Sequence, residues 1–118
     1  MQKERRQSPR VRLRLTTTFK LLRTGKVLRA LTKNVGAGGL CLITDELLEP
    51  GSPLELEVHL PDRPAPVRCV GEVVWSRPIE STARSYEQPA ETGVKFTSID
   101  PADRSSIMQF AAMNAMSF

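Results

Sequence analysis

Two short segments, far apart in the chain, contain the residues best suited to chemistry. Near the start, the run Arg5-Arg6-Gln7-Ser8-Pro9-Arg10 offers three guanidinium groups. A guanidinium can bind a phosphate through two parallel hydrogen bonds, pair with O6 and N7 of guanine, and stack on the face of a base. Pro9 disfavours helix at the residue before it, so an extended arm is expected here. The arm is therefore suited to holding an anionic nucleotide.

The second segment is Asn34-Val35-Gly36-Ala37-Gly38-Gly39, which separates two strand-like runs. Glycine tolerates positive φ and the close approach of a ligand. Successive backbone N–H groups in such a turn can also cradle an anion. Together, the two segments predict a clamp for an anion and a purine base.

The pair of motifs, Arg6-x-x-x-Arg10 followed by Asn34-x-Gly36-x-x-Gly39, resembles the motifs RxxxR and [D/N]xSxxG of the PilZ domain family. The resemblance covers almost the whole chain, since the segments 71–75 and 92–96 are similar to late strands of that fold. It implies a non-catalytic receptor for the bacterial second messenger cyclic di-GMP that relays the signal to a protein partner. The ligand-binding residues it implies are Arg5, Arg6, Arg10, Asn34, Gly36 and Gly39.

This sequence departs from the family pattern at one position, because Gly36 stands where the family has serine. The missing hydroxyl could remove one ligand hydrogen bond, worth about 0.5–1.5 kcal/mol, or up to roughly tenfold in affinity. Asn34 also offers one acceptor oxygen where a carboxylate offers two. A PilZ-like protein-interaction module with lost or weakened nucleotide binding is therefore the alternative.

The charge of the chain is unevenly distributed. Residues 1–33 contain 11 Lys and Arg against one acid, whereas residues 34–118 contain 6 against 12, which gives +10 and −6. A positive end of this kind attracts a small polyanion and orients its approach. A nucleic-acid partner is not expected, because the six aromatic residues of the chain provide few platforms for stacked bases.

Composition and motifs argue against an enzyme, a metal site and a cofactor. His59 is the only histidine and lies on the polar side of a strand pattern, with no partner for a catalytic dyad. Cys41 and Cys69 lack CxxC spacing and are predicted to be buried free thiols. No apolar run is long enough to cross a bilayer, and no apolar leader follows the N-terminus, so a cytoplasmic protein without membrane insertion is expected.

The fold class predicted from the pattern is all-β, with one domain over residues 1–118. Residues 1–10 are expected to form a flexible basic arm, 11–99 a barrel of about six antiparallel strands, and 100–118 a C-terminal helix. Apolar and polar residues alternate along most of the expected strands. These strands cover 11–21, 26–33, 40–44, 54–60, 67–75 and 92–99, with an irregular loop over 77–90.

Three finer expectations concern single positions. Gly71 is predicted to mark a β-bulge, because apolar residues occur at both odd and even positions around it. Trp75 continues the alternation of apolar residues along its strand and is therefore predicted to lie in the core. The alternative is that a base stacks on its ring. Asp100 is expected to cap the final helix, which should direct Ile107, Phe110, Ala111 and Met113 onto the barrel.

Overall fold

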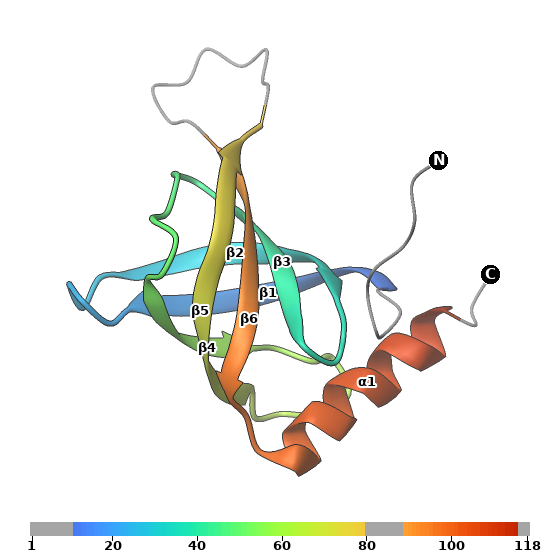
Figure 1. The fold of residues 1–118 in the computed structure, drawn as a ribbon. Helices are drawn as coiled ribbons and strands as arrows, with labels where there is room; N and C mark the ends of the chain where they lie inside the picture. Colours follow the sequence, from blue (N-terminus) through green and yellow to red (C-terminus); the bar gives the residue numbers. More distant parts are fainter. Residues whose placement is uncertain (1–10, 80–88, 116–118) are drawn as a thin grey trace.

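The computed structural model describes residues 11–79 and 89–115, and their side chains over 15–79 and 89–113. This part of the chain forms six strands followed by one helix (Figure 1). The strands are β1 (Val11–Leu21), β2 (Val27–Val35), β3 (Gly39–Thr44), β4 (Pro53–Val58), β5 (Val67–Pro78) and β6 (Ala90–Ser98), and the helix is α1 (Pro101–Ala115).

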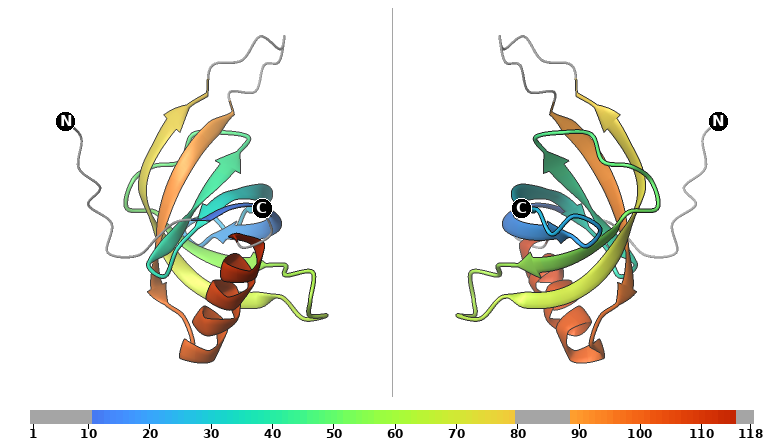
Figure 2. Two further views of the ribbon diagram at one scale, coloured as in Figure 1. Left: turned by 90° about the vertical axis from the view of Figure 1, so that its right-hand side faces the viewer. Right: turned by 90° about the vertical axis from the view of Figure 1, so that its left-hand side faces the viewer.

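The six strands close into a barrel in the order β1-β2-β3-β6-β5-β4, and every neighbouring pair is antiparallel. Among the strands that the structure describes, closure leaves none with an edge open to pairing with another chain. The predicted fold class is confirmed. The helix α1 lies along one side of the barrel and contacts β1 (Figures 1 and 2).

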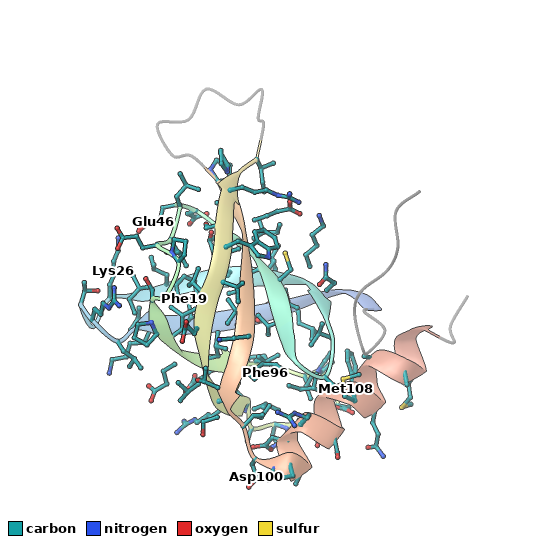
Figure 3. The ribbon with its side chains drawn as sticks, viewed as in Figure 1. Phe19, Lys26, Glu46, Phe96, Asp100 and Met108 are labelled. Atoms are coloured by element: carbon teal, nitrogen blue, oxygen red, sulfur yellow. The ribbon has the colours of Figure 1, made fainter. Side chains whose placement is uncertain are left out.

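Alternation along the strands fills the barrel with apolar side chains, as the sequence pattern predicts. Phe19, Leu42 and Leu56 come from three different strands and are almost completely buried. Two pairs of threonine hydroxyl groups form hydrogen bonds inside the barrel, Thr17 with Thr32 at 2.7 Å and Thr44 with Thr92 at 3.2 Å. A Lys26–Glu46 ion pair of 3.2 Å lies on the outside, away from α1 (Figure 3).

The helix begins with the predicted cap. Asp100 lies at its start (Figure 3), and the Oδ1 atom of Asp100 accepts a hydrogen bond of 2.8 Å from the backbone N–H of Ala102. Ile107 and Ala111 are buried against the barrel, but Met113 is 68% exposed, so its predicted burial there is wrong. In the described part of the chain, no helix combines the length and apolar character that a bilayer crossing needs.

Several boundaries differ from the sequence prediction. The strand β5 continues to Pro78 and β6 begins at Ala90, which shortens the predicted loop at both ends, and residues 80–88 lie outside the described part. The strand β4 ends at Val58 instead of at position 60, and α1 is described only as far as Ala115. A register shift between β5 and β6 falls next to Gly71, but the extra residue, Thr97, lies on β6. The bulge predicted at Gly71 is therefore on the partner strand, and Gly71 continues the buried alternation of Cys69 and Val73.

Candidate functional site

The first strand starts beside the glycine-rich segment. Val11 pairs with Val35, and the backbone of Arg12 pairs with that of Asn34. Arg5, Arg6 and Arg10 lie outside the described residues. The described chain enters the barrel at Val11, and its cross-strand partner Val35 directly precedes the glycine loop between β2 and β3. The point at which the predicted arm joins the fold therefore adjoins the second motif.

The predicted turn is shorter than expected, because Asn34 and Val35 end β2 and Gly39 begins β3. The loop between these strands consists of residues 36–38. The N–H of Gly36 donates to the carbonyl of Gly39 at 2.9 Å, and the carbonyl of Gly38 accepts from the N–H of Phe96 at 2.9 Å. The Gly36 N–H is thus used inside the loop, which removes it from the predicted anion cradle.

Gly39, at the start of β3, serves close packing and not an unusual backbone conformation. Among the described residues, positive φ occurs at Gly25 and Gly51 and not in this segment. A β-carbon built on Gly39 would lie 2.9 Å from the Cα of Lys95 and closer still to the carbonyl oxygen of Val94. Glycine at position 39 therefore allows β3 to approach β6.

Trp75 lies on the outside of the barrel, so its predicted place in the core is wrong. The register of β5 against β6 shifts between Val73 and Trp75, and the extra residue reverses the alternation expected from the sequence. The side chain of Ser76, the next residue, points inward and lies 2.8 Å from the buried hydroxyl of Thr92. Trp75 is consequently 39% exposed.

One row of residues crosses the outer face from Trp75 to Asn34. Trp75 pairs with Gly93, Gly93 pairs with Cys41, and Cys41 pairs with Asn34. Directly paired residues point to the same face of a sheet. The row spans three strand spacings, about 14 Å at ~4.8 Å each. It joins an exposed aromatic ring at one end to the motif asparagine at the other.

Four charged side chains border this row, and sequence analysis did not single them out. Lys95 is exposed and pairs across the sheet with Gly39. On the other side of the row, Glu91 accepts from Lys33 and also from Arg77, whose Nη2 lies 3.1 Å from Oε1. The guanidinium of Arg77 also lies over the ring of Trp75, with Cζ 5.0 Å from the centroid.

One sequence pattern could have pointed to some of these residues, namely the alternation of faces along the last strand. Had the strand been extended back to Ala90, Glu91, Gly93 and Lys95 would have been placed on one face. The partners on β2 and β5 could not have been found in this way. Their positions depend on register shifts next to Lys33 and Trp75.

Two cavities of about 270 and 220 Å³ lie elsewhere on the molecule. The larger is lined by residues of β4 and β5 and by the connection to α1, including Glu57 and Cys69. Burial, with a further contribution from the charge of Asp103, raises the pKa of the Cys69 thiol to about 11. At neutral pH this thiol is protonated and a poor nucleophile.

The other expectations for single residues can now be assessed. Cys41 and Cys69 are buried free cysteines, as predicted, and His59 is exposed. Within residues 11–79 and 89–115, no three His, Cys, Asp or Glu side chains come together as a group that could hold a metal ion. The outer row next to Asn34 is therefore the best candidate site that the described residues provide.

Comparison with protein-family models gives evidence on the family to which the chain belongs. The model of the PilZ domain matches residues 4–112, which include both predicted motifs and the whole barrel. The chain belongs to the PilZ domain family. The match extends through most of α1, so the PilZ domain accounts for nearly all of the sequence.

Solved PilZ structures share the fold at low sequence identity. The PilZ domain of YcgR from Escherichia coli, solved with cyclic di-GMP, has a TM-score of 0.75 at 13% identity, with 93% of this chain and 91% of that one covered. The PilZ domain of CeSA from a cellulose-synthesizing bacterium has a TM-score of 0.60 at 9% identity, with 92% and 99% covered. These similarities establish the barrel with its C-terminal helix as the PilZ fold.

Some similar structures belong to longer proteins. The inhibitor of motility MotI/DgrA from Bacillus subtilis has a TM-score of 0.74 at 19% identity, and the comparison covers 97% of this chain. This chain spans only 53% of MotI and 52% of MrkH, a cyclic di-GMP-dependent transcription regulatory factor. No curated protein matches the sequence.

Proposed function

We propose that this PilZ domain is a non-catalytic receptor for cyclic di-GMP and relays ligand binding to a protein partner. The observation that carries the proposal is the pairing of Val11 with Val35. This pairing attaches the arm that contains Arg6 and Arg10 beside the end of β2, where Asn34 lies. Family membership and the presence of cyclic di-GMP in the similar YcgR structure support the choice of ligand.

In the proposed complex, the arm supplies the positive charge. Arg6 and Arg10 bind the phosphates and the O6/N7 edges of the guanines, because a guanidinium matches both groups with paired donors. Arg5, on the opposite side of an extended arm, either reaches a second ligand molecule or faces water. Fixing the arm costs about 1–2 kcal/mol per residue, which the charge-assisted hydrogen bonds must offset.

The barrel supplies the other side of the site. Asn34 hydrogen-bonds one guanine, while the loop at Gly36 lets the ligand approach the backbone. Gly39 holds the start of β3 close to β6. Lys95 lies next to Gly39 and adds positive charge. The exposed indole of Trp75 offers a face on which a base can stack, a contact worth about 1–3 kcal/mol in nucleic-acid complexes.

Binding can be tested by calorimetric titration with cyclic di-GMP, with GMP as the ligand control. Arg6→Ala, Arg10→Ala and Asn34→Ala should each lower the affinity, the arginine variants by about tenfold or more. Arg23→Ala is the matched control, because it removes an exposed arginine from the β1–β2 turn. Equal binding by the wild type and both arm variants would exclude the arm from the site.

The second candidate function is a PilZ interaction module with weak or absent nucleotide binding. Glycine at position 36 favours it, because the serine hydroxyl of the family motif is missing and the Gly36 N–H is engaged by Gly39. The variant Gly36→Ser distinguishes the two functions. A receptor should gain up to roughly tenfold in affinity from the added hydroxyl. A module without a nucleotide site should bind no cyclic di-GMP in either form and should retain its protein partner.

A further inference from the structure

Glu91 connects two cations that belong to different strands. The Oε2 atom of Glu91 accepts from the ammonium of Lys33 on β2, and Oε1 accepts from Nε and Nη2 of Arg77 on β5 at 3.3 and 3.1 Å. The carboxylate side chain is only 14% exposed, whereas those of Lys33 and Arg77 are 45% and 69% exposed. The two cations therefore cover the carboxylate and remain accessible themselves.

This cluster borders the row that runs from Trp75 to Asn34. Lys33 directly precedes Asn34, and the register shift between β2 and β3 falls at Lys33. Arg77 follows Trp75 by two residues on the same strand, and its guanidinium lies over the indole. Both cations thus flank groups that the proposed function assigns to ligand recognition.

A carboxylate at the position of Glu91 needs an explanation, because it lowers the positive charge of the cluster. Lys33 and Arg77 together carry +2, and Glu91 reduces this to +1. By charge alone, a carboxylate next to a site for a dianion should weaken binding. A carboxylate that fixes the cations has the opposite effect, because long Lys and Arg side chains otherwise lose rotamer entropy when they bind a ligand.

We propose that Glu91 is a positioning residue of the cyclic di-GMP site, holding Lys33 and Arg77 in place to meet the negative charge of the ligand. This inference rests on the proposed receptor function. Arg77 has a second role in it, because its guanidinium covers part of the Trp75 ring and must share or leave that face when a base stacks there. Lys33 retains its contact with Glu91 in both states.

The test is the affinity of Glu91→Gln for cyclic di-GMP, measured beside the wild type by calorimetry. Glutamine keeps the size of the side chain and removes its charge. We expect affinity to fall about fivefold, the scale of a partly exposed charge interaction. Glu46→Gln is the matched control, since it breaks the Lys26–Glu46 pair of 3.2 Å at a distant place and should leave affinity unchanged.

Two further readouts separate positioning from a general loss of structure. In the Lys33→Ala/Arg77→Ala background, Glu91→Gln should not lower affinity further, because its cations are gone. Trp75 is the only tryptophan, so its fluorescence reports the site without a label. Glu91→Gln should change the emission of the free protein as Arg77 leaves the ring, while Glu46→Gln should not.

The outcomes distinguish this inference from the function on which it rests. If the wild type binds no cyclic di-GMP, both proposals are wrong. If the wild type binds and Glu91→Gln binds equally or more tightly, the receptor function stands and the positioning role of Glu91 is wrong. A fivefold loss that persists unchanged in the Lys33→Ala/Arg77→Ala background would also overturn it.

Discussion

The indole of Trp75 lies against the backbone of Gly93, and this contact requires that position 93 carry no side chain. A β-carbon built there would lie 2.9 Å from Cζ2 of Trp75 and closer still to Cε2 and Nε1. Gly93 thus provides the base on which the ring rests, while Arg77 lies over it. The contact fixes the ring on the outer face of the barrel, in the same row as Asn34.

Gly93→Ala should displace the indole. We expect the free energy of unfolding to fall by about 1–3 kcal/mol, as for other overpacked sites, and cyclic di-GMP to bind more weakly. The fluorescence of Trp75 should shift as the ring leaves the sheet. Urea unfolding and emission spectra measure both effects, and unchanged spectra would show that the ring does not depend on Gly93.

Gly39→Ala should weaken the pairing of β3 with β6. The new methyl group would meet the backbone of Val94 and Lys95, which cannot move aside as a flexible side chain can. A loss of about 1–3 kcal/mol in the free energy of unfolding is expected. Gly38→Ala is the matched control for this and the previous variant, because a β-carbon at position 38 meets nothing within 4 Å. Equal stabilities of the two alanine variants would contradict the close packing at Gly39.

Asp100→Ala should destabilise α1 by removing its N-terminal cap. The hydrogen bond from the N–H of Ala102 to Asp100 is lost, and such caps contribute about 1 kcal/mol. The melting temperature should fall accordingly. Asp62→Ala, in an exposed turn, serves as the control. A melting temperature equal to that of the control would show that the cap contributes nothing.

The stabilising effect of Glu91 should depend on pH. Hydrogen bonds from Lys33 and Arg77 hold the pKa of the Glu91 carboxyl below its ordinary value of 4.5, against the opposing effect of burial. A lowered pKa in the folded state stabilises the protein above the unfolded pKa, and this contribution is lost as the pH falls through the folded value. The wild type should therefore unfold at higher urea than Glu91→Gln at pH 7. The gap should close toward pH 3, and a gap that is the same at both pH values would contradict this account.

Alternation of apolar residues was sufficient to predict the barrel, because a closed antiparallel sheet buries every second side chain. Where the pattern is regular, as over 11–21, the predicted and observed strand agree. The cap at Asp100 could also be predicted, since it depends on residues close in sequence. The fold is therefore largely a consequence of local patterns.

The site could be predicted only in part. Around Trp75 the run Val73-Val74-Trp75 is apolar throughout, so nothing in it marks the extra residue that turns the indole outward. The Glu91 cluster joins three strands and becomes visible only once the barrel sets their register. Family motifs predicted Asn34 and Gly39, whereas cross-strand pairing identified their neighbours.

The most direct test of the receptor proposal is an NMR titration of the 15N-labelled protein with cyclic di-GMP. The proposal predicts that shifts concentrate at Asn34, Gly36, Gly39, the Trp75 indole N–H and residues 3–10, and that Arg6→Ala and Arg10→Ala reduce them. No ligand-induced shifts, or shifts confined to the cavity between β4 and β5, would contradict it.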